Sequence, residues 1–167
     1  MYDRETFTHD GQPFRVRIER DDHMGEPWKE HDGHGIVSDW TTRHKFPRER
    51  VLNSDRGSRR YYDIKASIAL AKADQWGLSD EERGKLATKL GRAPTPGEVT
   101  ARAVELDFDR LRAWCNDEWE WLCVGVEWLD RDGEVRATEW LGGIDGDGPY
   151  TDECARELAR RILDMAD

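Results

Sequence analysis

The chain has 167 residues, of which 37% are charged and 37% hydrophobic, and its formal net charge is −10. This length suffices for one domain with a full core, and eight tryptophans argue against a disordered chain. No run of about 18 apolar residues occurs and nothing marks the chain for secretion, so we expect no membrane association. Three cysteines without a framework spacing indicate reduced thiols and a cytoplasmic protein.

The charges are unevenly distributed. Residues 107–167 contain 17 acidic residues against 7 arginines, whereas residues 43–60 contain 7 basic residues against 2 acidic ones. An acidic half disfavours a nucleic-acid backbone as the partner and favours a basic protein surface. The alternative is that these charges only keep a tryptophan-rich domain in solution. The carboxylates predicted to form an acidic partner-binding face are Asp117, Glu118, Glu120, Asp145 and Asp147.

The first predicted element is a β-hairpin over residues 5–20. Phe14, Val16 and Ile18 alternate with polar residues, a period that leaves one side of a strand buried and the other in water. Residues 9–12, which include Asp10 and Gly11, supply the turn.

Residues 21–60 lack periodicity and are interrupted by glycine and proline, which predicts a long irregular loop. Long loops inside a domain are often functional. We therefore predict a second partner-binding surface here, made by Trp28, His31, His34 and Trp40. If Trp28 and Trp40 are buried, they only anchor the loop.

The same loop contains ligand types that suit a metal ion, namely His31, His34 and Asp32. Gly33 and Gly35 break any helix there, so the spacing is not that of a zinc-binding HExxH helix. The alternative is that these imidazoles bond backbone carbonyls in turns. No cofactor is expected.

A basic turn precedes the next predicted helix. Arg56, Arg59 and Arg60 are candidates for binding an anion such as phosphate at the start of that helix. The alternative is that they pair with the acidic C-terminal half of the same protein. The basic segment 43–60 also supports a further hypothesis, a nucleic-acid-binding module.

Apolar residues recur at helical spacing in four later segments, at about 61–76, 79–90, 96–116 and 151–165. Ser79 with Glu82, and Thr95 followed by Pro96, are helix-start signals. Between the third and fourth helices, residues 120–129 and 134–141 are rich in β-formers and flank a turn that ends in Asp132-Gly133.

These elements predict a single α+β domain spanning 1–167, in which the two hairpins join into one antiparallel sheet covered by about four helices. No catalytic motif is present, so no catalytic residue is predicted. We therefore favour a non-enzymatic protein over an enzyme. The alternative is a metal-dependent hydrolase or nuclease built on the histidine loop.

Several long segments carry a resemblance that spans most of the chain. They are FRVRIERDDHMGEPWKEHDGHGIVSDWTTR, RVLNSDRGSRRYYD, RAWCNDEWEWLCVGVEWLDRDGE and WLGGIDGDGPYTDECARELA. With them the chain resembles an uncharacterised family of small proteins encoded in tailed bacteriophages and prophages. Members of the family that the chain resembles have a Trp-Gly-Ile run where this chain has Trp140-Leu141-Gly142-Gly143-Ile144. The extra residue suggests a β-bulge.

The resemblance implies no activity, but small acidic phage proteins often act stoichiometrically on a host machine. We therefore expect a non-enzymatic accessory protein in the cytoplasm of a bacterial host. Its expected partner is a host protein or ribonucleoprotein complex, which it modulates or inhibits, as an anti-CRISPR or other counter-defence inhibitor does. Its acidic surface would occupy a basic groove, with exposed aromatic residues as anchors.

Overall fold

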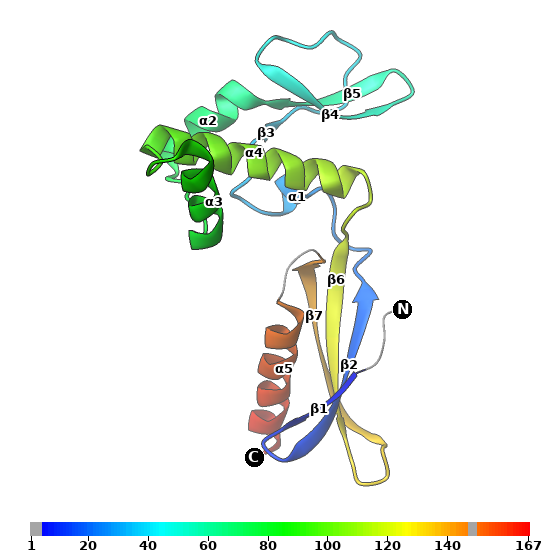
Figure 1. The fold of residues 1–167 in the computed structure, drawn as a ribbon. Helices are drawn as coiled ribbons and strands as arrows, with labels where there is room; N and C mark the ends of the chain where they lie inside the picture. The colour runs from blue at the N-terminus through cyan, green and yellow to red at the C-terminus, as the bar shows by residue number, and fades with distance from the viewer. Residues whose placement is uncertain (1–4, 147–149) are drawn as a thin grey trace. The chain divides into compact units, whose positions relative to one another are not determined.

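The computed structural model describes residues 5–146 and 150–167. It has the predicted α+β class, with all strand pairs antiparallel (Figure 1). One domain was expected because no change in composition divides the chain. Within the chain there are two compact units, which we call unit 1 (residues 1–24 and 119–167) and unit 2 (residues 25–118).

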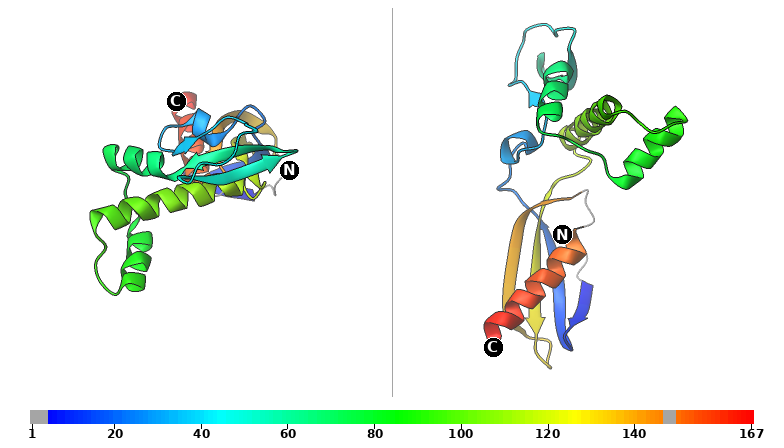
Figure 2. Two further views of the ribbon diagram at one scale, coloured as in Figure 1. Left: turned by 90° about the horizontal axis from the view of Figure 1, so that it is seen from above. Right: turned by 90° about the vertical axis from the view of Figure 1, so that its left-hand side faces the viewer.

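Unit 1 contains the two predicted hairpins joined into one sheet in the order β1-β2-β6-β7. The helix α5 packs on one side of this sheet (Figure 2, right). Phe14, Val124 and Val126 of the sheet and Leu158 and Ile162 of the helix are buried together in its core. The elements of unit 1 are β1 (Glu5–His9), β2 (Gln12–Arg20), β6 (Trp121–Leu129), β7 (Val135–Asp145) and α5 (Thr151–Ala166).

The bulge suggested by the extra residue after Trp140 is present in β7. Leu122 pairs with Ile144 and Val124 pairs with Leu141, so β7 has one residue more than β6 between these pairs. Gly143 adopts a φ of 68°, which a glycine tolerates without strain. The bulge therefore lies at Gly142–Gly143.

Unit 2 has its own sheet and its own core. The sheet has the order β3-β5-β4, and α2 and α4 bury Leu52, Tyr62, Val104, Phe108 and Leu111 against it. The elements of unit 2 are α1 (Pro27–Glu30), β3 (Ile36–Val37), β4 (Glu49–Asp55), β5 (Ser58–Asp63), α2 (Ile64–Ala73), α3 (Asp80–Leu90) and α4 (Pro96–Cys115).

Three expectations about this region were wrong. The segment 21–60 is not one irregular loop, because it contains α1, β3, β4 and the first half of β5. The helix expected from residue 61 begins at Ile64, since Tyr61 and Tyr62 lie in β5 and the Asp63 side chain caps the helix by accepting the Ala66 N–H. The helices do not all cover the hairpin sheet: α5 packs there, whereas α2 and α4 pack on the sheet of unit 2.

The predicted start signals of the two middle helices are confirmed. Ser79 accepts the Glu82 N–H at the start of α3. Thr95 and Glu98 form a reciprocal capping box at the start of α4, with Pro96 in its first turn.

Candidate functional site

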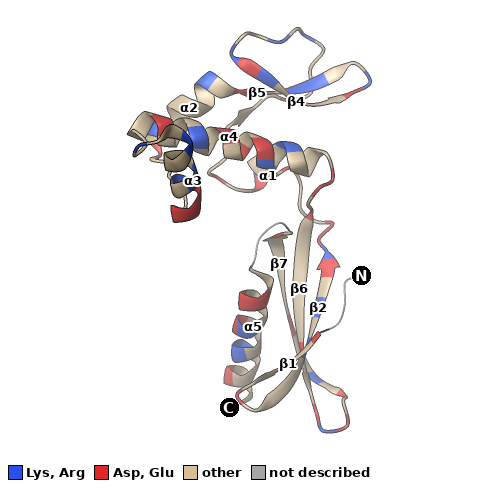
Figure 3. Ribbon diagram, in the orientation of Figure 1, with Lys and Arg blue, Asp and Glu red and all other residues tan. Residues whose placement is uncertain are grey.

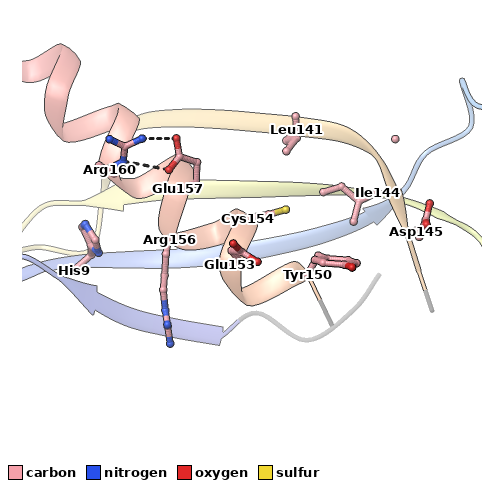
Figure 4. A pocket seen from close by; sticks show the side chains of 11 residues that line it. His9, Leu141, Ile144, Asp145, Tyr150, Glu153, Cys154, Arg156, Glu157 and Arg160 are labelled. Atoms are coloured by element: carbon pink, nitrogen blue, oxygen red, sulfur yellow. Dashed lines mark hydrogen bonds and ion pairs between the residues drawn. The ribbon is translucent and has the colours of Figure 1, made fainter. Parts of the chain in front are cut away.

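An open groove of about 820 Å³ lies in unit 1 (Figure 4). It runs along α5 and the second half of β7, and His9 of β1 also lines it. The lining residues are His9, Leu141, Gly143, Ile144, Asp145, Tyr150, Glu153, Cys154, Arg156, Glu157 and Arg160.

The groove combines an apolar lining with a charged rim. Leu141 and Tyr150 are 38% and 56% exposed, although burying such side chains is favourable. Burial raises the pKa of the Cys154 thiol, so this group stays neutral and belongs to the apolar lining. The groove can therefore accept apolar side chains of a partner.

The rim contains carboxylates and guanidinium groups on successive turns of α5 (Figure 3). The Arg160 guanidinium donates two hydrogen bonds to the Glu157 carboxylate, at 2.6 and 3.1 Å, and these bonds lower the pKa of Glu157. Glu153 has no such ion pair with a described residue. Glu153 is thus the rim carboxylate best placed to meet a cation from outside.

A buried carboxylate holds the bulge that lines the groove. Asp21 accepts the Gly143 N–H at 2.7 Å and the His23 N–H at 3.0 Å. These hydrogen bonds and that of the Cys123 thiol outweigh burial, which acts in the opposite direction, so the pKa of Asp21 is lowered. A Cβ on Gly142 would lie 2.8 Å from the carboxylate, so glycine is needed at this position.

The predicted acidic face is divided between the units. Asp117 and Glu118 are exposed after α4 in unit 2, whereas Glu120 and Asp145 are half-buried in unit 1. Glu120 lies 3.6 Å from the Arg20 guanidinium. The fifth predicted residue, Asp147, lies outside the described residues. Of this set, only Asp145 lines the groove.

The two tryptophans of the predicted loop surface have different environments. Trp28 is half-buried, with its ring 5.8 Å from the ring of Trp114, so it anchors α1 to α4. Trp40 is 41% exposed, and the Arg60 guanidinium lies 4.3 Å from its ring centre.

The two histidines of that predicted surface, His31 and His34, have different environments. His31 and Asp32 are exposed, whereas half-buried His34 places Nδ1 2.7 Å from a carboxylate oxygen of Asp107 on α4. Within residues 5–146 and 150–167, no three His, Cys, Asp or Glu side chains gather as metal ligands do. The set predicted from the sequence, His31, His34 and Asp32, is therefore not assembled.

Asp107 is the centre of a buried hydrogen-bond cluster. Besides His34, it accepts the Gly35 N–H at 2.7 Å and the Tyr62 hydroxyl at 2.8 Å. Burial and the nearby carboxylate raise the pKa of Tyr62 far above its usual value, so its hydroxyl remains a donor.

Because a carboxylate only accepts, His34 donates from Nδ1 to Asp107. His34 also lines a second pocket of about 400 Å³. The bonds of His34 and Gly35 to Asp107 fasten residues 34–35 to α4. Sequence reasoning missed this cluster because 73 residues separate His34 from Asp107.

The predicted anion site is not at a helix start. Arg56, Arg59 and Arg60 lie in the β4–β5 hairpin, and Arg60 pairs with Glu26 at 3.2 Å. Arg56 and Arg59 are exposed and form no ion pair with the described residues.

Other arginines of the basic segment are also neutralised within the protein. Arg43 pairs with Glu49, Arg48 with Asp63, and Arg50 with Glu105. Much of segment 43–60 is therefore paired within the protein. The partners are Glu26, Glu49, Asp63 and Glu105, and not the acidic C-terminal half that the alternative interpretation named.

No helix in the described ranges combines the length and the apolar character that crossing a membrane requires. Comparisons with models of protein families, with curated proteins and with solved structures gave no match to this chain.

Proposed function

We propose that this protein is a non-enzymatic binding protein whose groove between β7 and α5 takes an apolar and basic segment of another protein. The observation that supports this most strongly is the open apolar groove with exposed Leu141 and Tyr150 beside the carboxylate of Glu153. Aromatic and aliphatic anchors in such grooves contribute most of the binding energy at protein interfaces. A nearby carboxylate selects a cationic partner and speeds its association.

The proposed partner is a host protein or ribonucleoprotein complex of a bacterium, which the protein modulates or inhibits in the manner of a phage accessory protein. Counter-defence activity of the anti-CRISPR kind is one form of this function. The overall acidity of the chain supports it, since a chain of net charge −10 is attracted to basic surfaces such as those that bind nucleic acid.

Site-specific photo-crosslinking in bacterial lysate tests where the partner binds. A benzophenone amino acid is placed at Tyr150 in the groove, and at Phe46 of unit 2 as the control, because both side chains are exposed and aromatic. We expect one host protein to be crosslinked in stoichiometric amount at position 150 and not at position 46. Equal capture at both positions, or capture at 46 alone, would exclude the groove as the binding surface.

Charge reversal tests the electrostatic part of the proposal. Glu153→Arg should weaken capture roughly tenfold, whereas Glu81→Arg on exposed α3 should not. Repeating the capture at high salt and with a chelator separates the alternatives. Nucleic acid that is lost at high salt would favour the basic segment 43–60. A divalent ion that is lost to the chelator would favour the metal-dependent enzyme.

A further inference from the structure

A hollow of about 360 Å³ in unit 2 is lined by positively charged side chains. Three of its seven lining residues are cationic, namely Arg48 before β4, Arg50 in β4 and Lys65 in α2. The carboxylate in the lining, that of Glu49, is buried. The remaining lining residues are the apolar Pro47, Ile64 and Ile68. The hollow therefore presents positive charge beside an apolar wall.

The ion pairs around this hollow leave their cations on the outside. Arg48 pairs with Asp63, but the Arg48 side chain is 52% exposed and that of Asp63 only 15%. Arg43 pairs with Glu49, and here the exposed fractions are 37% and 5%. A ligand that approaches from water therefore meets the guanidinium groups first. The carboxylates behind them fix their positions, which reduces the side-chain entropy lost when a ligand binds.

Two lysines next to these pairs have no carboxylate partner among the described residues. Lys65 is exposed and forms no ion pair there. The Lys45 ammonium donates to two backbone carbonyl oxygens, at 3.1 and 3.0 Å, and so keeps its full charge. Arg50 contributes less, because its partner Glu105 is itself 37% exposed. What we call the basic surface consists of Arg43, Lys45, Arg48 and Lys65.

Planar groups that can stack on a base lie on the same surface. The Phe46 ring is 44% exposed, and the guanidinium groups of Arg43 and Arg48 lie 4.3 and 5.0 Å from its centre. Unpaired nucleic-acid bases stack on aromatic rings and on guanidinium planes, while their phosphates bind lysine and arginine. An acidic peptide would use the cations alone, and the bases of a duplex are already stacked on one another. The combination favours a single strand.

The acidity of the chain, which disfavours nucleic acid, belongs to unit 1. Unit 2 contains 17 basic and 17 acidic residues, whereas unit 1 contains 9 basic and 19 acidic ones. Unit 2 is therefore neutral overall, and its basic surface is a local excess of positive charge. Contacts between such cations and phosphates supply most of the sequence-independent affinity for nucleic acid.

We propose that the basic surface of unit 2 binds single-stranded nucleic acid, with phosphates at Arg48 and Lys65 and a base stacked beside Phe46. RNA and DNA share this chemistry. The inference goes beyond the proposed function, because it places a different ligand on unit 2 and uses no residue of the groove in unit 1.

Fluorescence anisotropy of labelled oligonucleotides of about 12 nucleotides, titrated with the full chain, tests this proposal. Single-stranded RNA, single-stranded DNA, a duplex of the same sequence and a glutamate-rich peptide are compared. We expect a single strand to bind most tightly, with an affinity that falls steeply between about 50 and 200 mM salt. The ratio of the RNA and DNA affinities then shows which of the two the surface prefers.

Lys65→Gln should weaken binding about tenfold at low salt and reduce the salt slope by about one, because one phosphate contact is lost. The matched control is Lys89→Gln, which removes the same charge from an exposed position on α3 and should change neither quantity. Phe46→Ala should weaken binding at least about fivefold through lost stacking, whereas Phe46→Tyr should retain it.

Absence of binding to either single strand at about 50 mM salt would overturn the proposal. Equal losses in Lys65→Gln and Lys89→Gln would overturn it as well. A duplex or a glutamate-rich peptide that binds as tightly as the single strands would also contradict it, because the surface would then respond to charge alone. Crosslinking at Tyr150 is measured separately, so this proposal and the proposed function can fail independently.

Discussion

At the scale of single residues, Asp107 has the largest structural role in unit 2. Its carboxylate accepts bonds from His34, Gly35 and Tyr62, and it is only 9% exposed. Three donors from two segments, residues 34–35 and β5, thus converge on one side chain. A buried donor that loses its acceptor carries the full cost of desolvation.

We expect Asp107→Ala to reduce the free energy of unfolding by roughly 2–4 kcal/mol, because three donors lose their acceptor. The matched control is Asp109→Ala, an exposed carboxylate on the same helix, which should change it by less than about 0.5 kcal/mol. Urea unfolding followed by tryptophan fluorescence measures both. Equal effects of the two variants would contradict the role assigned to Asp107.

Glu49 gives unit 2 a specific acid sensitivity. The hydrogen bonds from Arg43 lower the pKa of this buried carboxyl below its ordinary value of 4.5, against the opposing effect of burial. A group whose pKa is lower in the folded state stabilises the fold above its unfolded pKa, and this contribution is lost as the pH falls. The loss should therefore begin near pH 4.5 and continue below it.

The pH dependence is measured as the urea midpoint between neutral pH and the acid range. Glu49→Gln should lower the midpoint at neutral pH and flatten its decline below pH 4.5, because the variant has no proton to gain there. Other carboxyls with lowered pKa values, including Asp21 and Glu127, remain in the variant and retain part of the decline. An unchanged slope would show that Glu49 contributes nothing to it.

At the scale of elements, the close approach of β3 to its neighbours depends on Gly35. A Cβ at this position would overlap the Tyr62 hydroxyl and the Ser67 hydroxyl, and both side chains are fully buried. Neither can move aside without opening the core, so the backbone before β3 requires a residue without a side chain.

Gly35→Ala should therefore destabilise the protein by about 1–3 kcal/mol, the usual cost of overpacking a core. Gly84→Ala in α3 is the control, because no atom lies within 4 Å of the added Cβ. That variant should gain about 0.5–1 kcal/mol from better helix propensity. Thermal unfolding by circular dichroism distinguishes the two signs, and a stabilising Gly35→Ala would refute the packing argument.

The elements predicted from sequence were those with strong local signals. The hairpins 5–20 and 120–141 and the last three helices have clear periodicity and caps, and the structure has them within a few residues. The β4–β5 hairpin was missed because its turn uses Arg56 at a φ of 48° before Gly57, a pair that is not a common turn signal. Tyr61 and Tyr62 were assigned to a helix because their spacing to Ile64 and Ile68 fits one, whereas Asp63 begins the helix after them.

The candidate site was predictable only in part. Asp145 was named from its charge, but the groove needs Leu141, Tyr150 and Cys154 from two elements, and no spacing rule brings these together. The contact of His34 with Asp107 likewise depends on tertiary packing between a loop and α4.

At the scale of the whole molecule, unit 2 is an insertion between two neighbouring strands of unit 1. Arg20 of β2 pairs with Leu122 of β6, and the Asp21 N–H donates to the Trp121 carbonyl at 2.8 Å. The chain therefore leaves the sheet at one strand end and returns beside it after the 94 residues of unit 2, Gly25–Glu118. Insertions at such sites are tolerated because the ends of the inserted unit lie close together.

This topology predicts that each unit folds without the other. Residues 25–118 contain a complete core of buried Leu52, Tyr62, Val104, Phe108 and Leu111, so the isolated segment should unfold cooperatively in urea. Residues 1–24 joined to 119–167 by a short Gly-Ser linker should form a meander of β1, β2, β6 and β7 packed on α5.

Two-dimensional NMR of each piece is the measurement, with the full chain as the reference. Dispersed amide signals that overlay on those of the full chain would confirm two independent units. Because the groove lies in unit 1, the linked piece should also retain the partner binding proposed above. A piece that folds but does not bind the partner would show that binding needs residues of unit 2, and the site would then have to be sought there.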